Sequence, residues 1–288
     1  YRTQRRANMM DKEQKDHQST YASSASSVRT ATHPKASVRA LDLLCIEDLT
    51  VIFDGFKALD ITYFGVDRNE LRVIIGPNGA GKTTLCDVIS GKTRANTGTV
   101  MFNDVEVTHL SETEIAQLGV GRKFQTPTVF DSLTVYENME LSLPGRRGVW
   151  RNLWGRETGD QRDAIMASLE RVHLTESAHR PSKYLSHGQR QWLEISMLMI
   201  SQPKLLLVDE PAAGLTDHET ELTAQLLLEL KGQHTVIVIE HDMEFVRRLA
   251  SRVTVLCEGK ILADGTLEHV QNDPGVIAAY LGRAKERA

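Results

Sequence analysis

The chain has few cysteines and no long apolar run. Its 288 residues contain three cysteines, an odd number without CxxC spacing: Cys45, Cys86 and Cys257. A disulfide framework or a zinc site is therefore not expected, and this cysteine use fits a reducing cytoplasm. Apolar runs such as residues 205–208 are far shorter than a membrane-spanning helix, so we expect no transmembrane segment. The first forty residues also lack the apolar stretch of a secretory signal peptide.

Positive charge is scarce outside the first forty residues. The chain holds 34 Lys and Arg against 38 Asp and Glu, a formal net charge of −4. Residues 1–40 contain eight basic and three acidic residues, so the remainder has 26 basic and 35 acidic ones. Binding to the phosphate backbone of nucleic acid requires clustered cations. We therefore expect no nucleic-acid partner.

Residues 1–40 are also poor in apolar side chains. Ser, Thr, Gln, Arg and Ala dominate, and the only β-branched aliphatic residues are Val28 and Val38. Such a segment cannot bury enough apolar surface to offset the entropy lost on ordering. The sequence predicts a disordered extension over 1–40 and a folded domain over 41–288. A regulatory or membrane-surface role for the arginines of the extension is the alternative to an inert leader.

The remaining residues alternate between strand and helix patterns. β-branched or apolar runs predict buried strands, and helical spacing dominates from about residue 134 to residue 200. Two capping boxes, Ser111-x-x-Glu114 and Thr134-x-x-Glu137, each predict the start of a short helix. Strands alternating with helices indicate an α/β fold whose parallel sheet is covered on both sides and interrupted by a helical block. The predicted strands lie around Ile46 to Phe53 and at residues 71–75, 99–102, 205–209, 235–239 and 253–257.

A phosphate-binding loop follows the strand predicted at residues 71–75. The motif G-x-x-x-x-G-K-[ST] is matched by Gly76-Pro77-Asn78-Gly79-Ala80-Gly81-Lys82-Thr83, and a helical pattern follows it. Glycines let backbone N–H groups converge on phosphate oxygens, and the following helix adds its positive N-terminal end. We expect Lys82 to reach the β- and γ-phosphates and the Thr83 hydroxyl to bind Mg²⁺.

A second acidic motif ends the strand predicted at residues 205–209. Asp209 at the strand end suits Mg²⁺ coordination next to Thr83. Glu210 follows directly and is placed to polarise a water molecule for in-line attack on the γ-phosphorus. These two motifs alone leave kinases, GTPases, helicases and transport ATPases open.

Four further motifs, in their order along the chain, resemble those of ATP-binding cassette (ABC) ATPases. Residues 185–189, Leu-Ser-His-Gly-Gln, resemble the LSGGQ signature, and Gln125 matches the Q-loop glutamine. Residues 213–217 resemble the D-loop, and His241 resembles the switch histidine. The resemblance covers about residues 43–282. It implies a P-loop NTPase fold with a parallel-sheet core, an N-terminal antiparallel β subdomain and a helical subdomain at about 126–203.

The same resemblance implies a role for each matching residue. ABC ATPases work as head-to-tail dimers that enclose two ATP molecules, so the signature of one subunit closes over the nucleotide of the other. The resemblance implies that Glu210, His241 and Gln125 are the catalytic residues. It implies that Thr83, Gln125 and Asp209 bind the metal. The ATP contacts would come from Phe53, Gly76, Pro77, Asn78, Gly79, Ala80, Gly81, Lys82, Thr83, Thr84, Ser186, Gly188, Gln189 and Asp217.

Two positions in this set leave alternatives open. Phe53 lies roughly where the family stacks an aromatic side chain on adenine, with Phe56 as the rival and a core role possible for either. His187 stands where the signature usually has glycine. Because Ser186 and Gly188 match the signature, we expect this departure to change only the fine geometry of the site and not its activity.

Narrower features resemble the ATP-binding subunits of importers for branched-chain amino acids and urea. They are found at residues 211–215, 240–243, 272–274 and 280–282, and residues 122–127 with 185–195 look closest to the urea importer group. The resemblance implies an ATPase on the cytoplasmic face of the inner membrane that drives solute uptake. We expect urea as the solute, with a branched-chain amino acid or short amide as the alternative. The implied partners are permease subunits, a second cassette of the same or a different chain and, indirectly, a solute-binding protein.

Other interpretations of the chain are weaker. A soluble ABC protein acting on nucleic acid or ribosomes would commonly carry two cassettes or a coiled-coil insert, and this chain has one phosphate loop. A non-catalytic assembly protein would not need both Glu210 and His241. The segment 146–156, with Trp150 and Trp154 among arginines, is either a surface excursion or a contact with membrane subunits or lipid. Trp192 is expected in the core.

Overall fold

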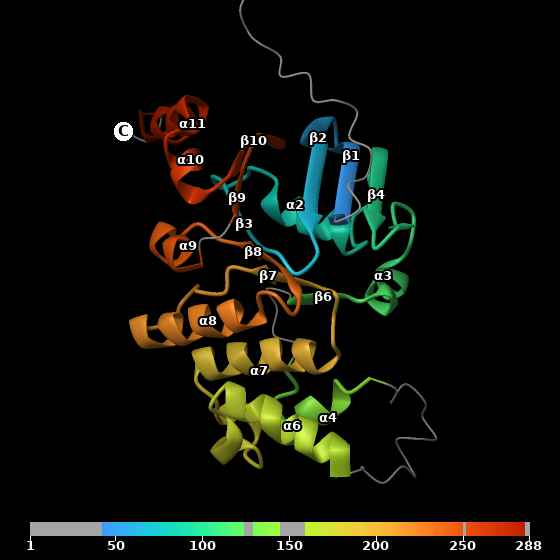
Figure 1. The fold of residues 1–288 in the computed structure, drawn as a ribbon, viewed down its shortest axis with the longest axis vertical. Coiled ribbons are helices and arrows are strands. Elements are labelled where there is room, and N and C mark those ends of the chain that lie inside the picture. Colours follow the sequence, from blue (N-terminus) through green and yellow to red (C-terminus); the bar gives the residue numbers. More distant parts are fainter. Residues whose placement is uncertain (1–41, 124–128, 145–158, 250–251, 286–288) are drawn as a thin grey trace, which may run out of the picture. The chain divides into compact units, whose positions relative to one another are not determined.

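A four-stranded antiparallel sheet and a six-stranded sheet organise the residues described in this computed structural model (Figure 1). The described residues are 42–123, 129–144, 159–249 and 252–285, with side chains described up to residue 279. All of them belong to one compact unit, Ala40–Ala288. In this part of the chain, no helix is both long enough and apolar enough to cross a bilayer.

The antiparallel sheet has the order β2-β1-β4-β5. Its first hairpin turns at Asp54 and Gly55, both with positive φ (48° and 86°), as expected for a tight turn that matches strand twist. The first five residues of β1 are all buried, and its last residue, Phe53, is exposed. The antiparallel subdomain implied by the family resemblance is therefore present. Its strands are β1 (Asp42–Phe53), β2 (Phe56–Asp67), β4 (Thr97–Phe102) and β5 (Val105–Glu106).

The larger sheet has the order β10-β9-β3-β8-β7-β6, with parallel pairing everywhere except between β10 and β9. Strands β3, β7 and β8 are buried along their whole length, which explains their near-continuous apolar sequences. The strands predicted at the corresponding positions are confirmed. They are β3 (Leu71–Ile75), β7 (Leu205–Asp209), β8 (Thr235–Ile239) and β9 (Arg252–Cys257). The sheet also contains two strands that the sequence did not predict, β6 (Val120–Lys123) and β10 (Lys260–Gly265).

Two apolar cores cover the two faces of the larger sheet. Along β7, Leu205 and Leu207 join the core formed with the antiparallel sheet and α2, whereas Leu206 and Val208 join the core formed with α8 and α9. This alternation follows from the period of two in a strand. The predicted sheet, covered on both sides, is thus confirmed. The helices of these layers are α2 (Lys82–Ile89), α3 (Glu112–Leu118), α8 (Asp217–Leu230), α9 (Met243–Leu249), α10 (Leu267–Gln271) and α11 (Pro274–Lys285).

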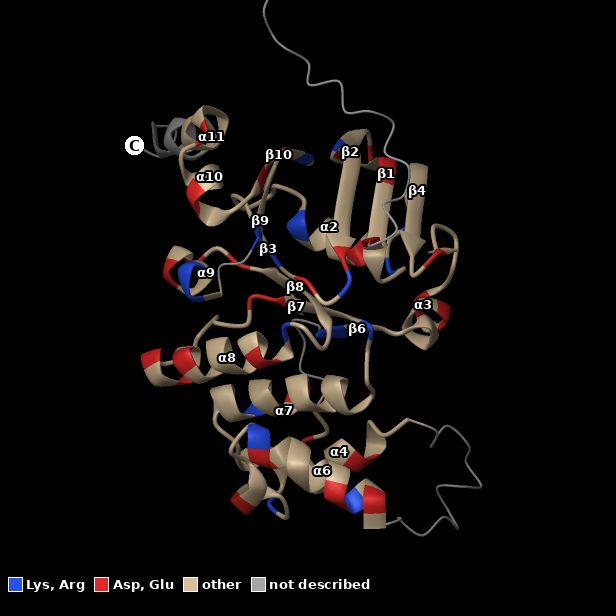
Figure 2. Cartoon of the chain, in the orientation of Figure 1, with Lys and Arg blue, Asp and Glu red and all other residues tan. Residues whose placement is uncertain are grey.

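A third core lies within the predicted helical block. Figure 1 shows α4 (Val135–Leu141), α6 (Gly159–Arg171) and α7 (His187–Ile200) side by side, and these helices contact one another. Trp192 packs in this core, where its Nε1 donates a hydrogen bond to Thr223 Oγ1 at 2.9 Å. The capping boxes predicted for α3 and α4 are both formed. Nearby, α8 carries Asp and Glu but neither Lys nor Arg (Figure 2).

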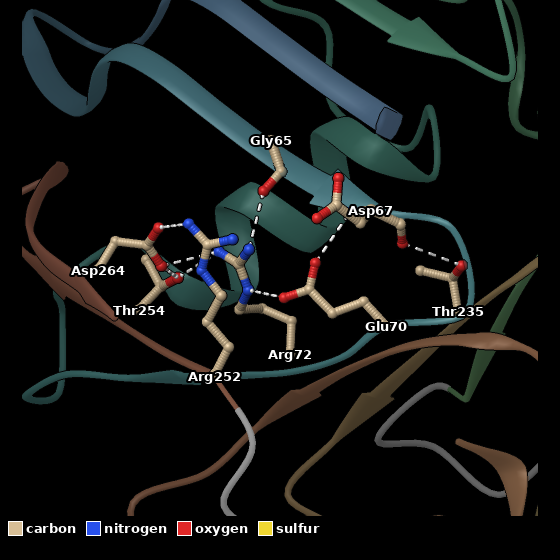
Figure 3. Close-up of polar contacts among 8 residues, drawn as sticks. All are labelled: Gly65, Asp67, Glu70, Arg72, Thr235, Arg252, Thr254 and Asp264. Carbon is tan, nitrogen blue, oxygen red and sulfur yellow. Dashed lines mark hydrogen bonds and ion pairs between the residues drawn. The ribbon is translucent and has the colours of Figure 1, made fainter. Parts of the chain in front are cut away.

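A buried arginine ties the strand before the phosphate loop to its neighbours. Arg72 of β3 is fully buried and donates from Nε to Glu70 Oε1 at 2.6 Å (Figure 3). Its Nη1 donates to Asp264 Oδ1 and Thr254 Oγ1, each at 2.9 Å, and its Nη2 donates to Gly65 O at 3.0 Å. The guanidinium therefore connects β3 with β2, β9 and β10 and fixes the strand that leads into the loop.

Candidate functional site

The loop between β3 and α2 can be built only with glycine at several positions. Gly79 and Gly81 have φ of 78° and 102°, a left-handed conformation that residues with a Cβ rarely adopt. At Gly76 a Cβ atom would lie 2.1 Å from the carbonyl oxygen of Leu256. At Gly81 it would lie 2.7 Å from the carbonyl oxygen of Ala58. Close packing therefore requires glycine at positions 76 and 81, and the left-handed backbone favours it at positions 79 and 81.

Lys82 begins α2 and is buried beside the loop. Its Nζ donates hydrogen bonds to the carbonyl oxygens of Gly76 at 2.8 Å and Pro77 at 3.1 Å. Burial lowers the pKa of Lys82, while the nearby carboxylates of Glu210 and Asp209 oppose that shift. The ammonium group is therefore bound to the phosphate loop and interacts electrostatically with the carboxylates of Asp209 and Glu210 at the end of β7.

The next two residues of α2 differ in exposure. The side chain of Thr83 is exposed and that of Thr84 is half-buried. The Thr83 hydroxyl is thus accessible at the N-terminal end of α2. Asn78 and Gly79, earlier in the loop, are exposed as well.

Asp209 ends β7 as a buried carboxylate with an unsatisfied oxygen. Its Oδ2 is one of the buried side-chain oxygens of the described residues that have no hydrogen-bond partner. Burial and the neighbouring Glu210 raise the pKa of Asp209, and nearby cations oppose that shift. A buried oxygen without a partner is costly unless a ligand or ion satisfies it. The acceptor suits a hard cation, which prefers oxygen ligands.

Glu210 and His241 meet although they are far apart in sequence. Glu210 follows β7 with φ of 48°, and its N–H donates to Ile239 O of β8 at 3.0 Å. His241 Nδ1 lies 3.3 Å from Glu210 Oε1. A left-handed conformation at a residue with a long side chain costs free energy and is typical of functional sites. The parallel pairing of β7 with β8 places both residues at one edge of the sheet.

The signature segment caps α7 and contacts the start of α8. Ser186 Oγ accepts from Gln189 N, and Gln189 Oε1 accepts from Ser186 N, which forms a capping box. The Ser186 hydroxyl also donates to Glu219 Oε1 at 3.2 Å. A Cβ at Gly188 would lie 2.4 Å from that same oxygen, so a larger residue here would require the Glu219 side chain to move.

His187, the departure from the family signature, points toward the D-loop. Its Nε2 lies 3.3 Å from Ala213 O. Ser186 and His187 are exposed, and Asp217, the first residue of α8, is exposed as well. These side chains are accessible to a second molecule.

Phe53 and Phe56 flank the tip of the β1–β2 hairpin and pair in register. Their exposed fractions are 47% and 67%, so the alternative of a core role is wrong for both. Ala58, two residues after Phe56, approaches Gly81, which places this hairpin beside the phosphate loop. Either ring is available for stacking on a base. Gln125 and the pair Trp150 and Trp154 lie outside the described residues.

Sequence patterns did not single out Glu240 as a functional residue. This carboxylate follows β8 with an exposed fraction of 1% and accepts three backbone hydrogen bonds. Burial raises its pKa, and the hydrogen bonds from Ala212, His241 and Asp242 oppose the shift. The available signal was its position directly after an apolar strand, the same signal that identified Asp209.

Comparison with protein families decides the class of this site. A family model described as "ABC transporter" matches residues 59–213, more than half of the chain. The chain belongs to the ABC transporter family. A second model, described as "Branched-chain amino acid ATP-binding cassette transporter", matches residues 260–286 of this ABC protein.

Individual relatives of the ABC protein agree with this assignment. The high-affinity branched-chain amino acid transport ATP-binding protein LivG of Escherichia coli K12 is 36% identical over 251 residues, covering 84% of this chain and 98% of the relative. A solved ATP-binding cassette in its ADP conformation has a TM-score of 0.73 and 31% identity, with 84% of this chain and 99% of that chain covered. A dimeric cassette in a post-hydrolysis state with ADP and Pi has a TM-score of 0.66 and 25% identity, with 78% and 98% covered.

The family and the fold together establish the enzyme. The chain is an ATP-hydrolysing subunit of an ABC transporter, with the cassette fold that the motif order implied. The nucleotide expected from the phosphate loop is therefore confirmed.

Proposed function

We propose that this ATPase drives an importer for branched-chain amino acids. The family model at the C-terminus carries that description, and so does the LivG relative that this chain covers almost completely. Urea, the solute expected first from the sequence, has no support among these relatives. The comparisons favour the alternative named with it. An ATPase subunit does not contact the solute, so this part of the proposal rests on similarity.

The single observation that carries the chemistry is the meeting of Glu210 and His241 beside Asp209. Backbone N–H groups of the phosphate loop, except at Pro77, and the N-terminus of α2 bind the triphosphate, with Lys82 supplying a positive charge. Mg²⁺ fits the Thr83 hydroxyl and the unsatisfied oxygen of Asp209, and it would neutralise charge on the phosphates. Gln125, assigned by resemblance, would complete the metal site.

Glu210 then acts as general base. Its carboxylate accepts the proton of the water that attacks the γ-phosphorus. His241, 3.3 Å away, orients that carboxylate and contacts the γ-phosphate. Phe53, with Phe56 as the alternative, stacks on the adenine ring.

A second cassette completes the site. The exposed Ser186, with Gly188 and Gln189, lies at the N-terminus of the 14-residue helix α7 and closes over the γ-phosphate held by a partner cassette. Asp217 belongs to the same contact surface. The partner is a copy of this chain or a different cassette, and permease subunits hold the pair at the cytoplasmic face of the inner membrane. A solute-binding protein acts indirectly, through the permease.

The test of this chemistry is Glu210→Gln, which keeps size and removes the negative charge. Loss of a positioned general base typically lowers the rate by about 10²- to 10⁴-fold. Lys82, Thr83 and Asp209 remain, so ATP binding should persist and ATP-bound dimers should accumulate. Glu221→Gln, the same change at an exposed site of α8 paired with Arg248, is the matched control.

Two outcomes would contradict the chemistry. Turnover in Glu210→Gln close to that of Glu221→Gln would show that Glu210 is not the base. Full ATP binding without any ATP-dependent rise in molecular mass, with the partner cassette supplied, would contradict the paired-cassette arrangement.

The solute is tested separately by uptake. Cells lacking this chain should lose uptake of labelled leucine and keep uptake of labelled urea. Loss of urea uptake alone would overturn the branched-chain proposal and leave the ATPase chemistry unaffected.

A further inference from the structure

The buried carboxylate of Glu240 has no part in the chemistry proposed above. It follows β8, the central neighbour of β3 and β7, and its own N–H donates to Ile74 O of β3 at 3.1 Å. The side chain is almost fully buried at the end of the sheet where the phosphate loop begins and where Asp209 and Glu210 lie. A buried carboxylate is expensive unless hydrogen bonds stabilise it, so its contacts indicate what it does.

Those contacts join two loops of the site. Oε1 accepts from Ala212 N at 3.0 Å, in the turn that directly follows Glu210. Oε2 accepts from His241 N at 3.0 Å and from Asp242 N at 3.4 Å. One oxygen therefore holds the loop of the base and the other holds the loop of the switch histidine.

The chemical type of the side chain matters for this arrangement. All three partners are N–H donors, and a carboxylate offers two oxygens that both accept. An amide offers one oxygen and an NH₂ group, so one loop would face a donor in place of an acceptor. A leucine or methionine would leave all three N–H groups without this partner.

We propose that Glu240 is a positioning residue that keeps Glu210 and His241 in the relative positions that catalysis requires. The inference rests on the proposed roles of those two residues. The almost fully buried carboxylate of Glu240 contacts the backbone of the two loops. It acts by fixing the backbone on either side of the 3.3 Å contact between the Glu210 carboxylate and the His241 ring.

The test is Glu240→Gln in the full chain, with its partner subunits where turnover requires them. Misplacement of a catalytic group by about 1 Å can cost on the order of 10²-fold in rate. We expect kcat to fall about 10- to 100-fold and the KM for ATP to change less than about threefold, because the phosphate loop is untouched. Asp264→Asn, a change in the polar cluster around Arg72, controls for loss of stability alone.

A double-mutant comparison separates positioning from a general structural role. In the Glu210→Gln background the base is already absent, so Glu240→Gln should lower the residual rate by less than about threefold. The same fold loss in both backgrounds would overturn the inference, and so would a kcat equal to that of Asp264→Asn. A loss expressed only in KM would overturn it as well.

Failure of the proposed chemistry would look different. If Glu210→Gln itself turns over ATP normally, the assignment of Glu210 as base is wrong, and the positioning role of Glu240 is refuted with it. If Glu210→Gln is inactive and Glu240→Gln is fully active, only the role of Glu240 is refuted. Should Glu240→Gln fail to fold, Glu240→Asp replaces it. Its shorter side chain cannot span both loops and should show the same loss in kcat with KM unchanged, whereas full activity would refute the role.

Discussion

Arg72→Met removes the guanidinium that ties β3 to its neighbours while keeping a long apolar side chain. The wild-type group makes two ion pairs and two further hydrogen bonds, and it lies 5.6 Å from the centre of the Phe64 ring. Methionine can fill the volume next to that ring. The variant therefore isolates the polar contacts seen in Figure 3 from the packing.

The size of the effect follows from what each partner retains. Removing one member of a buried ion pair typically costs 3–5 kcal/mol because the other charge loses its compensation. Asp264 keeps Arg252 at 2.6 Å and Thr254 at 2.8 Å, and Glu70 keeps the N–H of Asp67 at 2.8 Å. We therefore expect the lower end, about 3 kcal/mol, which corresponds to a fall of about 6–12 °C in Tm for a domain of this size.

The assay is urea unfolding of the nucleotide-free chain, supported by calorimetry. Arg252→Met is the matched control, because Arg252 also binds Asp264 but its side chain is 42% exposed. Pairs of that kind contribute at most about 1 kcal/mol. A loss for Arg72→Met no larger than that for Arg252→Met would refute the argument that burial gives the Arg72 contacts their strength.

Two further predictions concern the site. Gly76→Ala should abolish folding or ATP binding, because its Cβ would lie 2.1 Å from the carbonyl oxygen of Leu256. At Gly79 a Cβ would meet open space, so Gly79→Ala should lower the stability by only about 1–2 kcal/mol, the cost of its left-handed φ. Calorimetry with and without ATP measures both, and equal losses would contradict this contrast. Burial raises the pKa of Asp209, so the folded chain binds more protons than the unfolded chain between the ordinary and the raised pKa. The stability of the nucleotide-free chain should therefore fall as pH rises through that window. Asp209→Asn should reduce this fall and raise Tm at neutral pH. The same variant should weaken Mg²⁺-dependent ATP turnover. A pH profile of Tm that is identical in the variant would show that Asp209 does not carry this cost.

Local sequence determined the parts of the site that are contiguous in the chain. The phosphate loop from Gly76 to Lys82 could be predicted because strand, loop and helix follow one another within a few residues. The capping boxes of α3 and α4 were predictable for the same reason, since each joins residues three apart. The order of the motifs added the family, and with it the roles expected for Ser186 and His241.

The tertiary structure decided what lies next to what. The contact of Glu210 with His241 depends on β7 pairing with β8, and no local pattern fixes the order of strands in a sheet. Sequence left a core role open for Phe53 and Phe56, and only the position of the hairpin tip showed both rings exposed. The same holds for Arg72 and Glu240, each of which has a partner from a distant strand or loop, Asp264 and Ala212 respectively. Backbone propensities act over a few residues, whereas buried polar groups are satisfied by whichever segments the fold brings beside them.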